Sequence, residues 1–531
     1  PASATPALGS PIPLAADVLA ATPATYVWKR DGVTIADGGR YSGATTGALV
    51  ITGVNATDNG AYTLTVTNAH GSASTTPATV TADAYVAGAL DPATAWVRAL
   101  NTSTQLNAIL HLPDGRTLVG GTASSAGGGV LDSAGTSISS GLVLVDAQGN
   151  LSSTPAGSFA RQVNVVRPLP DGKFLVAGSF SAVNGGSAVS AVRLNADLTR
   201  DNTFTPVSTN ITFVAAHGDA QGRVYLGGSF NNYNGQTGHN HLVRLKPDGS
   251  LDPDFNAVLN GAVASIVSLP DGRFYVGGAF STHSPSALPV PGLLRFLADG
   301  RVDPSFSAAS LTIGTPNALA VDAQGRVIVG TAFGIRRLLP DGSLDDTFST
   351  TVSVNNGVRA LAALPDGKIL VGGFFTSPTN RFFRLNADGT RDTAFDVGTG
   401  FTHTSGSNIA VTSIAPDSLG RVWLGGHGFT AYKGVASSAL GFAVLQSEAP
   451  ATFAFTRLPT AAHLNFGDTV TFAAAATGNN GFTWQWLKNG APLSDGPGVS
   501  GAKTATLTLS GLAAANAGDY SVRITGPGGV S

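Results

Sequence analysis

The chain has 531 residues, enough for about three or four domains, and a formal net charge of −2 at pH 7. It contains no cysteine, which excludes disulfides, thiolate metal sites and cysteine-based catalysis, and its charge gives no reason to expect nucleic acid as a partner. With 68 Gly, 29 Pro and short alternating runs of Val, Thr, Leu and Phe, the sequence predicts an all-β protein.

The first segment of the chain, residues 1–83, is related in sequence to the last, residues 448–531. "TYVWKRDG" (25–32) matches "TWQWLKNG" (483–490), and the spacings Trp28–Tyr62 and Trp486–Tyr520 are both 34 residues. A Trp on one strand followed by Asp-x-Gly-x-Tyr resembles the I-set immunoglobulin fold, which implies a buried Trp and a tyrosine corner. Both ends are therefore expected to be immunoglobulin-like β-sandwiches.

Two departures from the I-set pattern affect these expectations. Leu64 and Val522 occupy the position of the family's second cysteine, so both sandwiches must be stable without a disulfide. Asn516 replaces the aspartate of the second tyrosine corner, which puts the hydrogen bonding of that corner in doubt.

Between these segments, residues 84–447 contain seven copies of a hairpin with a turn such as "LPDG" or "DAQG". The turn glycines are Gly115, Gly172, Gly222, Gly272, Gly325, Gly367 and Gly420, at intervals of 57, 50, 50, 53, 42 and 53 residues. A period near 50 with short strands is typical of a propeller blade. Glycine is required at these turns because the backbone there takes positive φ. The double glycines that follow, such as Gly277 and Gly278, suit a strand crowded near a central axis.

A second motif, Arg-Leu-x-x-Asp-Gly-x-x-Asp-x-x-Phe, follows most hairpins and predicts a third strand, a turn and a fourth strand in each blade. The last copy lacks the final strand, whereas "GALDPATAW" (88–96) before the first hairpin aligns with "GSLDPDF" (249–255). We expect the two ends to overlap and close a seven-bladed β-propeller. The repeats resemble the delta-60 β-propeller of large secreted bacterial proteins, which implies an extracellular or cell-surface setting and no catalytic residue.

The C-terminal sandwich is expected to lack its last strand, because only 11 residues follow Tyr520 whereas 21 follow Tyr62 before the linker. Either the chain continues beyond this sequence, or another copy donates the strand, as in donor-strand complementation. The absence of an initiator methionine also indicates a processed product or a segment of a longer chain. No apolar run of about 18 residues predicts membrane insertion.

Three groups of residues are candidates for chemistry, and each has a simpler structural interpretation. The recurring acids Asp252, Asp303, Asp345 and Asp392 suit turn capping better than a ring of Ca²⁺ ligands or catalytic acids, since a catalytic site rarely needs so many copies. The basic residue after each hairpin turn is expected to pair with such acids or to lie on the surface, with an anion-binding ring as the alternative. In the polar loop 231–241, Tyr233, His239 and His241 are a possible ligand site, although no third metal ligand is evident. No cofactor is predicted.

These patterns predict a non-enzymatic bacterial extracellular protein with a structural or adhesive role. It would be a fibre subunit, made of copies joined end to end, or a segment of a large surface protein. The alternative is a module that binds a glycan or protein through the loops on one propeller face. A secreted polysaccharide-active enzyme is the third possibility, and carboxylates converging with aromatics in a pocket would indicate it.

Overall fold

The computed structural model describes residues 2–525 except for thirty short segments, and it consists of β-strands with one 3₁₀ turn, η3 (Ala514–Asn516). The segments left out are 5–11, 17–22, 38–40, 52–53, 55–57, 82–86, 88, 91–104, 113–114, 123–129, 132–136, 139–140, 146–150, 154–158, 181, 184–189, 207–210, 256, 285–289, 310, 312–313, 350, 403–408, 418–419, 430, 437–440, 448–452, 458–465, 479–482 and 490. Within the described residues, no helix is long and apolar enough to cross a membrane. The all-β prediction is confirmed.

The structure divides into two compact units. One contains Pro1–Ala87, Asp417–Arg421 and Gln446–Ser531, and so holds both immunoglobulin-like domains; the other contains Gly88–Pro416 and Val422–Leu445 and holds the repeats.

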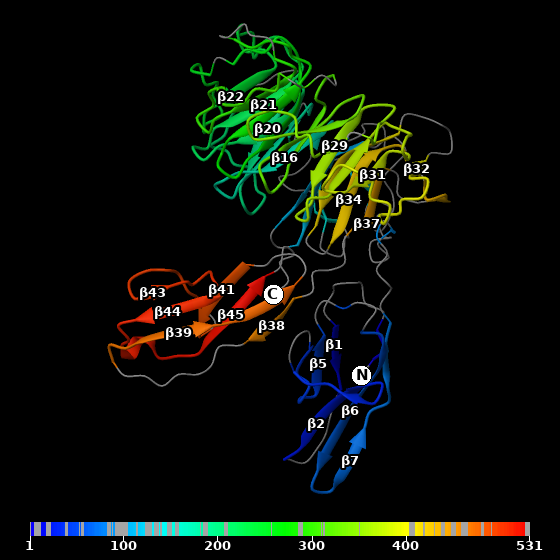
Figure 1. The fold of residues 1–531 in the computed structure, drawn as a ribbon, viewed down its shortest axis with the longest axis vertical. Coiled ribbons are helices and arrows are strands. Elements are labelled where there is room, and N and C mark those ends of the chain that lie inside the picture. The colour runs from blue at the N-terminus through cyan, green and yellow to red at the C-terminus, as the bar shows by residue number, and fades with distance from the viewer. Residues whose placement is uncertain are drawn as a thin grey trace. The chain divides into compact units, whose positions relative to one another are not determined.

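The N-terminal domain is a sandwich of two sheets around Trp28 (Figure 1). One sheet contains β1 (Ile12–Ala15), β5 (Ala48–Ile51) and β4 (Tyr41–Ser42); the other contains β3 (Val33–Thr34), β2 (Thr25–Arg30), β6 (Gly60–Asn68), β7 (Gly71–Ser74) and β8 (Ala78–Val80). Trp28 is fully buried and its Nε1 donates to the Thr46 carbonyl at 2.9 Å, while the Tyr62 hydroxyl donates to the Asp58 carbonyl at 2.8 Å. Both expected hallmarks are confirmed. Leu64, fully buried beside Trp28, fills the place of the missing cysteine.

The C-terminal domain repeats this design. Its strands are β38 (Phe453–Arg457) with β40 (Ala475–Gly478); β39 (Thr469–Ala473) with β44 (Thr506–Ser510) and β43 (Val499–Ser500); and β42 (Ala491–Pro492) with β41 (Thr483–Lys488) and β45 (Tyr520–Thr525). Trp486 is fully buried and donates to the Thr504 carbonyl at 2.9 Å. The Tyr520 hydroxyl donates to the main-chain oxygen of Asn516 at 2.7 Å, so this corner is intact despite the Asp-to-Asn change. The prediction that the last strand is missing depends on residues 526–531, which lie outside the described residues.

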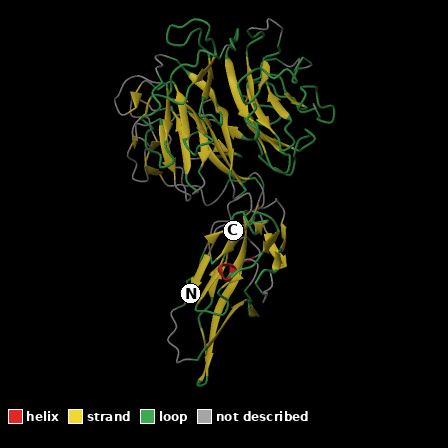
Figure 2. Cartoon of the chain, turned by 90° about the vertical axis from the view of Figure 1, so that its left-hand side faces the viewer, coloured by secondary structure: helices red, strands yellow, loops and turns green. Residues whose placement is uncertain are grey.

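The repeat unit is a series of antiparallel sheets, each built from one hairpin and the strand after it (Figure 2). In chain order, from the inner strand outward, they are β9 (Leu106–His111), β10 (Thr117–Gly121), β13 (Leu142–Val145) and β14 (Leu151–Ser153); β16 (Val163–Pro168), β17 (Phe174–Gly178) and β19 (Ala191–Leu194); β20 (Phe213–Gly218), β21 (Val224–Gly228) and β22 (Leu242–Leu245); β23 (Val263–Ser268), β24 (Phe274–Gly278) and β25 (Leu293–Phe296); β26 (Ala318–Val321), β27 (Val327–Gly330) and β28 (Ile335–Leu338); β29 (Val358–Ala363), β30 (Ile369–Gly373) and β31 (Phe382–Leu385); and β33 (Ala410–Pro416), β34 (Arg421–His427) and β37 (Phe442–Gln446). Two-residue strands decorate the connections: β11 (Val130–Leu131), β12 (Ser137–Ile138), β15 (Phe159–Ala160), β18 (Ala182–Val183), β32 (Phe401–Thr402), β35 (Ala431–Tyr432) and β36 (Val435–Ala436).

The predicted fourth strand of each repeat is wrong for most sheets. After the second turn the chain makes one isolated bridge to the third strand, as between Leu245 and Leu251, and then turns at Asp252. The Asp252 carboxylate accepts a hydrogen bond from the Asp254 N–H, an Asx turn that bends the backbone before a strand can extend. The seven hairpin glycines have φ of 75–86°, as predicted.

The two ends of the repeat unit meet at one described residue pair, whereas residues 88 and 91–96 of the segment predicted to supply the missing strand lie outside the described residues. Leu90 forms an antiparallel bridge with Leu445, the counterpart of the Leu245–Leu251 bridge. The inner strands also contact each other in order, β9, β16, β20, β23, β26, β29 and β33, and β33 contacts β9. A closed ring of inner strands therefore surrounds a central channel.

Candidate binding site

The recurring acids of the second motif serve the fold. In five sheets an arginine on the third strand is almost completely buried and pairs with the aspartate eight residues later. The pairs are Arg193–Asp201, Arg244–Asp252, Arg295–Asp303, Arg337–Asp345 and Arg384–Asp392, with N–O distances of 2.6–2.8 Å. Burial alone would raise the pKa of Asp303, but hydrogen bonds from Ser305 and Arg295 hold that pKa below its usual value. These carboxylates are thus committed to partners within their own sheets.

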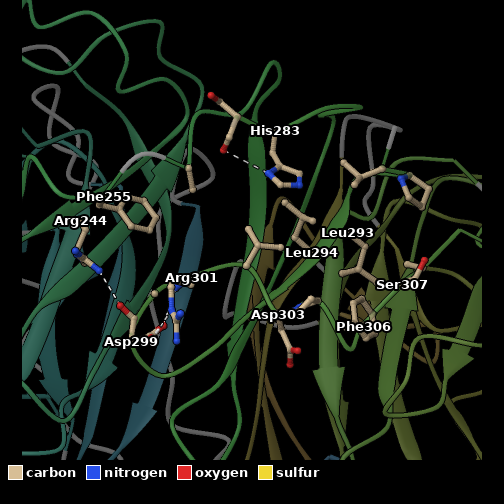
Figure 3. A pocket seen from close by; sticks show the side chains of 18 of the residues that line it. Arg244, Phe255, His283, Leu293, Leu294, Asp299, Arg301, Asp303, Phe306 and Ser307 are labelled. Carbon is tan, nitrogen blue, oxygen red and sulfur yellow. Dashed lines mark hydrogen bonds and ion pairs between the residues drawn. The ribbon is translucent and has the colours of Figure 1, made fainter. Parts of the chain in front are cut away.

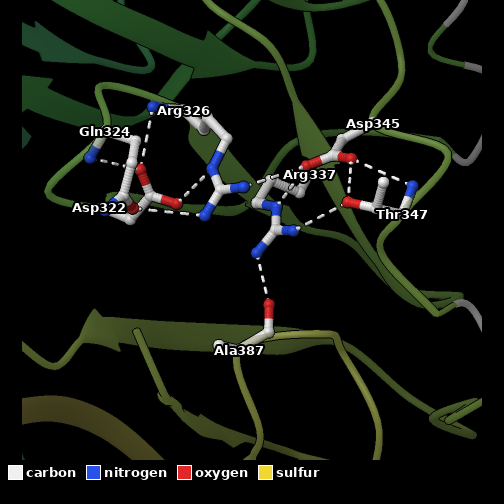
Figure 4. A network of polar contacts seen from close by, with 7 residues as sticks. All are labelled: Asp322, Gln324, Arg326, Arg337, Asp345, Thr347 and Ala387. Carbon is white, nitrogen blue, oxygen red and sulfur yellow. Dashed lines mark hydrogen bonds and ion pairs between the residues drawn. The ribbon is translucent and has the colours of Figure 1, made fainter. Parts of the chain in front are cut away.

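The buried arginines also join neighbouring sheets. Arg337 donates from Nε to Asp345 at 2.7 Å and from Nη1 to the Ala387 carbonyl of the next sheet at 2.5 Å (Figure 4). Its guanidinium carbon lies 4.6 Å from the centre of the Phe348 ring, the last residue of the motif. Arg-x-x-x-x-x-x-x-Asp-x-x-Phe is therefore one packing unit.

The basic residues after the hairpin turns pair with acids, as expected. Lys173 lies 2.8 Å from Asp201, and Arg326 lies 2.7 Å from Asp322 and 3.4 Å from Asp345. The alternative of an anion-binding ring made of these residues has no support, because their charges are already neutralised by carboxylates.

In the loop singled out for its histidines, most residues are exposed, but Tyr233 and His241 face inward. Tyr233 is 2 % exposed and His241 is 9 % exposed, and the His241 Nδ1 lies 3.3 Å from the Phe230 N–H. His239 is half-buried. Tyr233 and His241 hold this loop against the third sheet and are not available to a ligand. Within the described part of the chain, no three side chains of His, Asp or Glu gather as a metal site.

A pocket of about 780 Å³ in the repeat unit lies between the third and fourth sheets (Figure 3). Its lining is mainly apolar and includes Phe255, Leu294 and Phe306. The polar groups at its edge already have partners: Arg244 bonds the Asp299 carbonyl and Arg301 pairs with the Asp299 carboxylate. This pocket offers few free groups to orient a ligand.

A smaller pocket, of about 190 Å³, is the mouth of the central channel and is lined by all seven inner strands. One residue of each inner strand, eight positions before the turn glycine, lines it at the same level. These residues are Asn107, Asn164, Val214, Ala264, Asn317, Arg359 and Thr412. In most of these strands the pairing with the second strand of the hairpin shifts register at this residue, which marks a β-bulge. At Asn164, for example, the shift lies between Val163 and Val165. The bulge lets a polar side chain occupy an otherwise apolar strand.

This ring of seven residues has two different halves. On one side, Thr412 donates to the Leu106 carbonyl at 2.8 Å, Asn107 donates to Asn164 at 2.9 Å, and Asn164 donates to the Phe213 carbonyl at 2.9 Å. These bonds tie the last, first, second and third sheets together.

On the other side, polar side chains remain free. Within the described residues, Ser265, the Asn317 amide and the Arg359 guanidinium form no hydrogen bond or ion pair. The Arg359 guanidinium is held only by its contact with the Phe374 ring, 5.2 Å from the ring centre. Unused donors in a concave site are what a polar ligand requires.

Arg167 brings a second cation into the pocket from within the channel. Its side chain keeps contact with solvent, yet so much protein surrounds it that desolvation lowers its pKa. It has no hydrogen bond or ion pair to any described residue. Ile109, Ile266 and Leu319 also line the pocket.

Next to Arg167, His217 gives the repeat unit a pH-dependent stability. The imidazole stacks on Phe274 with ring centres 4.4 Å apart, and Nδ1 lies 2.6 Å from the Ser268 hydroxyl. Burial lowers the His217 pKa to about 4, below its value of about 6.5 in an unfolded chain. Between these values the unfolded chain binds the proton more readily, so the free energy of unfolding should fall as pH drops from 6.5 to 4.

We expect the His217→Phe variant to lose this part of the pH dependence, measured by denaturant unfolding between pH 4 and 7. His239→Phe, which changes a half-buried loop histidine, should retain it. Identical pH profiles for the wild type and His217→Phe would contradict the assignment.

The channel site was not predicted, although the sequence holds its signal. Aligning the hairpins on their glycines places Asn, Asn, Val, Ala, Asn, Arg and Thr in one column, inside strands that are otherwise apolar. Alternation alone assigns this column to a sheet face, because a bulge cannot be read from period-2 patterning.

Comparisons with known proteins agree with both kinds of domain. A family model described as "Domain of unknown function (DUF5122) beta-propeller" matches residues 169–204, 221–255, 269–306, 325–348 and 364–395. The model of the immunoglobulin I-set domain matches residues 1–81 and 453–531. The two resemblances expected from sequence are confirmed. No curated protein matches the chain significantly.

Several solved structures are similar to the chain. They include neural ectodermal development factor IMP-L2, 25 % identical over 15 % of this chain and 38 % of that one, with a TM-score of 0.14. The M4 domain of titin is 25 % identical over 15 % of this chain and 85 % of that one, with a TM-score of 0.13. Extracellular domains 3–5 of Drosophila OTK are 9 % identical over 97 % and 88 %, with a TM-score of 0.15. The chain spans little more than a third of IMP-L2, and TM-scores this low carry no functional argument.

Proposed function

Because the chain is a DUF5122 β-propeller domain flanked by two immunoglobulin I-set domains, we propose that it is a non-enzymatic adhesive protein whose propeller binds a ligand at the channel mouth. The observation that carries this proposal is a group of free polar side chains at the channel mouth. Ser265, Asn317 and Arg359 line a pocket and have no hydrogen-bond or ion-pair partner among the described residues, whereas the arginines of the larger pocket are bound.

The finer architecture belongs to the same proposal: seven blades, one for each hairpin. It is supported by the closed order of contacts from β9 to β33 and by the Leu90–Leu445 bridge. A seven-fold ring brings one residue from each blade to the channel mouth, so a single pocket can combine side chains from seven repeats.

We also propose a bacterial extracellular setting, with the chain acting as a fibre subunit or as part of a large surface protein. Immunoglobulin domains at both ends suit end-to-end arrangement, either with copies of the chain or within a longer one. The low charge, 12 % of residues, suits packing against such neighbours. The propeller would bind a surface glycan or a surface protein.

Blocking the channel mouth tests the adhesive function. We expect Asn317→Trp to abolish binding of the fluorescently labelled chain to an array of glycans and surface proteins, because the indole fills the space that a ligand would occupy. The Asn317 side chain has no partner to lose, so folding should survive the change.

Lys246→Trp is the matched control, since Lys246 is an exposed residue at a second-motif turn and does not line the channel pocket. Equal binding by Asn317→Trp and the wild type would move the binding surface to the loops. No binding by the wild type to any arrayed molecule would contradict the adhesive function.

A further inference from the structure

We propose that the channel mouth recognises one acidic sugar unit, a hexuronate at the end of a glycan, through the guanidinium groups of Arg359 and Arg167. This inference rests on the proposed adhesive function and adds the chemistry of the ligand. Its basis is the unbalanced charge of the pocket. The described lining residues include two arginines without ion-pair partners and no carboxylate.

The electrostatic situation of the two arginines favours an anionic ligand. Elsewhere in the propeller, buried arginines meet carboxylates at 2.6–2.8 Å, as Arg193 does with Asp201. Arg167 is crowded by protein strongly enough to lower its pKa, yet it lacks such a partner. A carboxylate supplied by a ligand would offset that desolvation, and the planar guanidinium of Arg359 presents paired donors that match a carboxylate.

The other groups and the size of the pocket argue for a sugar rather than a simple anion. A volume of about 190 Å³ holds on the order of ten water molecules, more than inorganic phosphate needs and close to one sugar ring. The Asn317 amide offers both donors and an acceptor, and the Ser265 hydroxyl offers one of each, as hydroxyl groups of a sugar require. The exposed surface of the pocket is mostly polar, which suits a ring rich in hydroxyl groups.

An exposed aromatic lies on the same face of the propeller. Phe333 is 74 % exposed and lies in the short connection between β27 and β28. This connection begins after Gly330. Gly330 pairs with Ala318, the residue after Asn317. A large apolar ring left in solvent at this place provides a surface on which the next sugar of a glycan can stack.

Isothermal titration calorimetry on the full chain at low salt tests the proposal. The probes are D-glucuronate, its methyl glycoside as a mimic of a glycan end, D-glucose and inorganic phosphate. We expect the glucuronate glycoside to bind and glucose to bind at least tenfold more weakly. Arg359→Gln and Arg167→Gln should each weaken glucuronate binding about tenfold or more, the effect of losing a hydrogen bond to a charged group.

Two further variants separate loss of the site from loss of folding. Asn317→Asp changes almost no volume but adds a carboxylate, and should abolish glucuronate binding while thermal unfolding stays unchanged. Arg301→Gln removes an exposed arginine outside the channel and should leave binding intact.

Glucose or phosphate binding as tightly as glucuronate would overturn the acidic-sugar assignment while leaving the adhesive function possible through another ligand. Unchanged glucuronate binding in Arg359→Gln would also overturn it. Binding of free glucuronate without its glycoside would support the acid site but contradict the adhesive function, because a surface glycan presents a glycosidically linked unit.

Discussion

The Arg244→Met variant is expected to lower the free energy of unfolding of the propeller by about 3–5 kcal/mol, the usual effect of removing one partner from a buried ion pair. Arg244 binds Asp252 at 2.7 Å and the Asp299 carbonyl of the next sheet at 2.9 Å. Methionine preserves the contact with Phe255 but provides no donor. Asp252, which is 5 % exposed, would keep the hydrogen bond from the Asp254 N–H but would lose its cationic partner.

Three controls identify the cause of the effect. Arg337→Met should cost less, because Arg326 lies 3.4 Å from Asp345 and can take over part of the pairing (Figure 4). Arg301→Gln breaks an exposed pair and should change stability by about 0–1 kcal/mol. The double variant Arg244→Met/Asp252→Leu should recover much of the loss. Denaturant unfolding followed by intrinsic fluorescence measures all four, and equal stability of Arg244→Met and the wild type would contradict the structural role of the pair.

The repeats have the same types of residue at the same positions, which explains why so much of this fold could be predicted. Turn glycines, buried tryptophans and tyrosine corners depend on local backbone geometry, so the sequence pattern identifies them directly. Closure of the ring was also predictable, because residues 88–96 resemble the strand missing from the last hairpin. The predicted fourth strand was wrong because the Asx turn at Asp252 and its equivalents competes with strand extension.

The binding site was harder to predict because it depends on contacts between repeats. The recurring aspartates were expected to cap turns, which they do, but their pairing with an arginine eight residues earlier requires knowing that β22 and the following turn lie side by side. The absence of an ion-pair partner for Arg359 likewise depends on the neighbouring repeats, because their described residues place no carboxylate in the pocket. Loop polarity drew attention to Tyr233 and His241, which the structure buries, because a short polar loop can still direct one aromatic and one imidazole into the core.

The Gly278→Ala variant is expected to lower the free energy of unfolding more than Gly277→Ala or Gly334→Ala does. A Cβ at Gly278 would lie 2.1 Å from the Ala262 carbonyl oxygen, and main-chain atoms at this distance must move apart. At Gly277 the nearest atom is a Leu319 methyl at 3.0 Å, which a rotamer change can shift. We expect a loss of about 3 kcal/mol or more for Gly278→Ala and about 1 kcal/mol for Gly277→Ala.

Gly334→Ala provides the control, because its Cβ would meet only an Arg336 nitrogen at 3.5 Å, an ordinary contact. Thermal and denaturant unfolding of the three variants give the order of their effects. Equal stability of Gly278→Ala and Gly334→Ala would show that the sheet absorbs the methyl without moving.

The expected damage at Gly278 extends to the channel mouth, because Gly278 pairs with Val263 directly before the bulge that places Ala264 and Ser265 in the pocket. The second glycine lets the two strands approach closely enough to form that bulge, and six of the inner strands share the arrangement. If this coupling holds, the Gly278→Ala protein that remains folded should bind the glucuronate glycoside more weakly than Gly277→Ala does. Binding unaffected by Gly278→Ala would separate the double glycine from the site and leave it a role in packing alone.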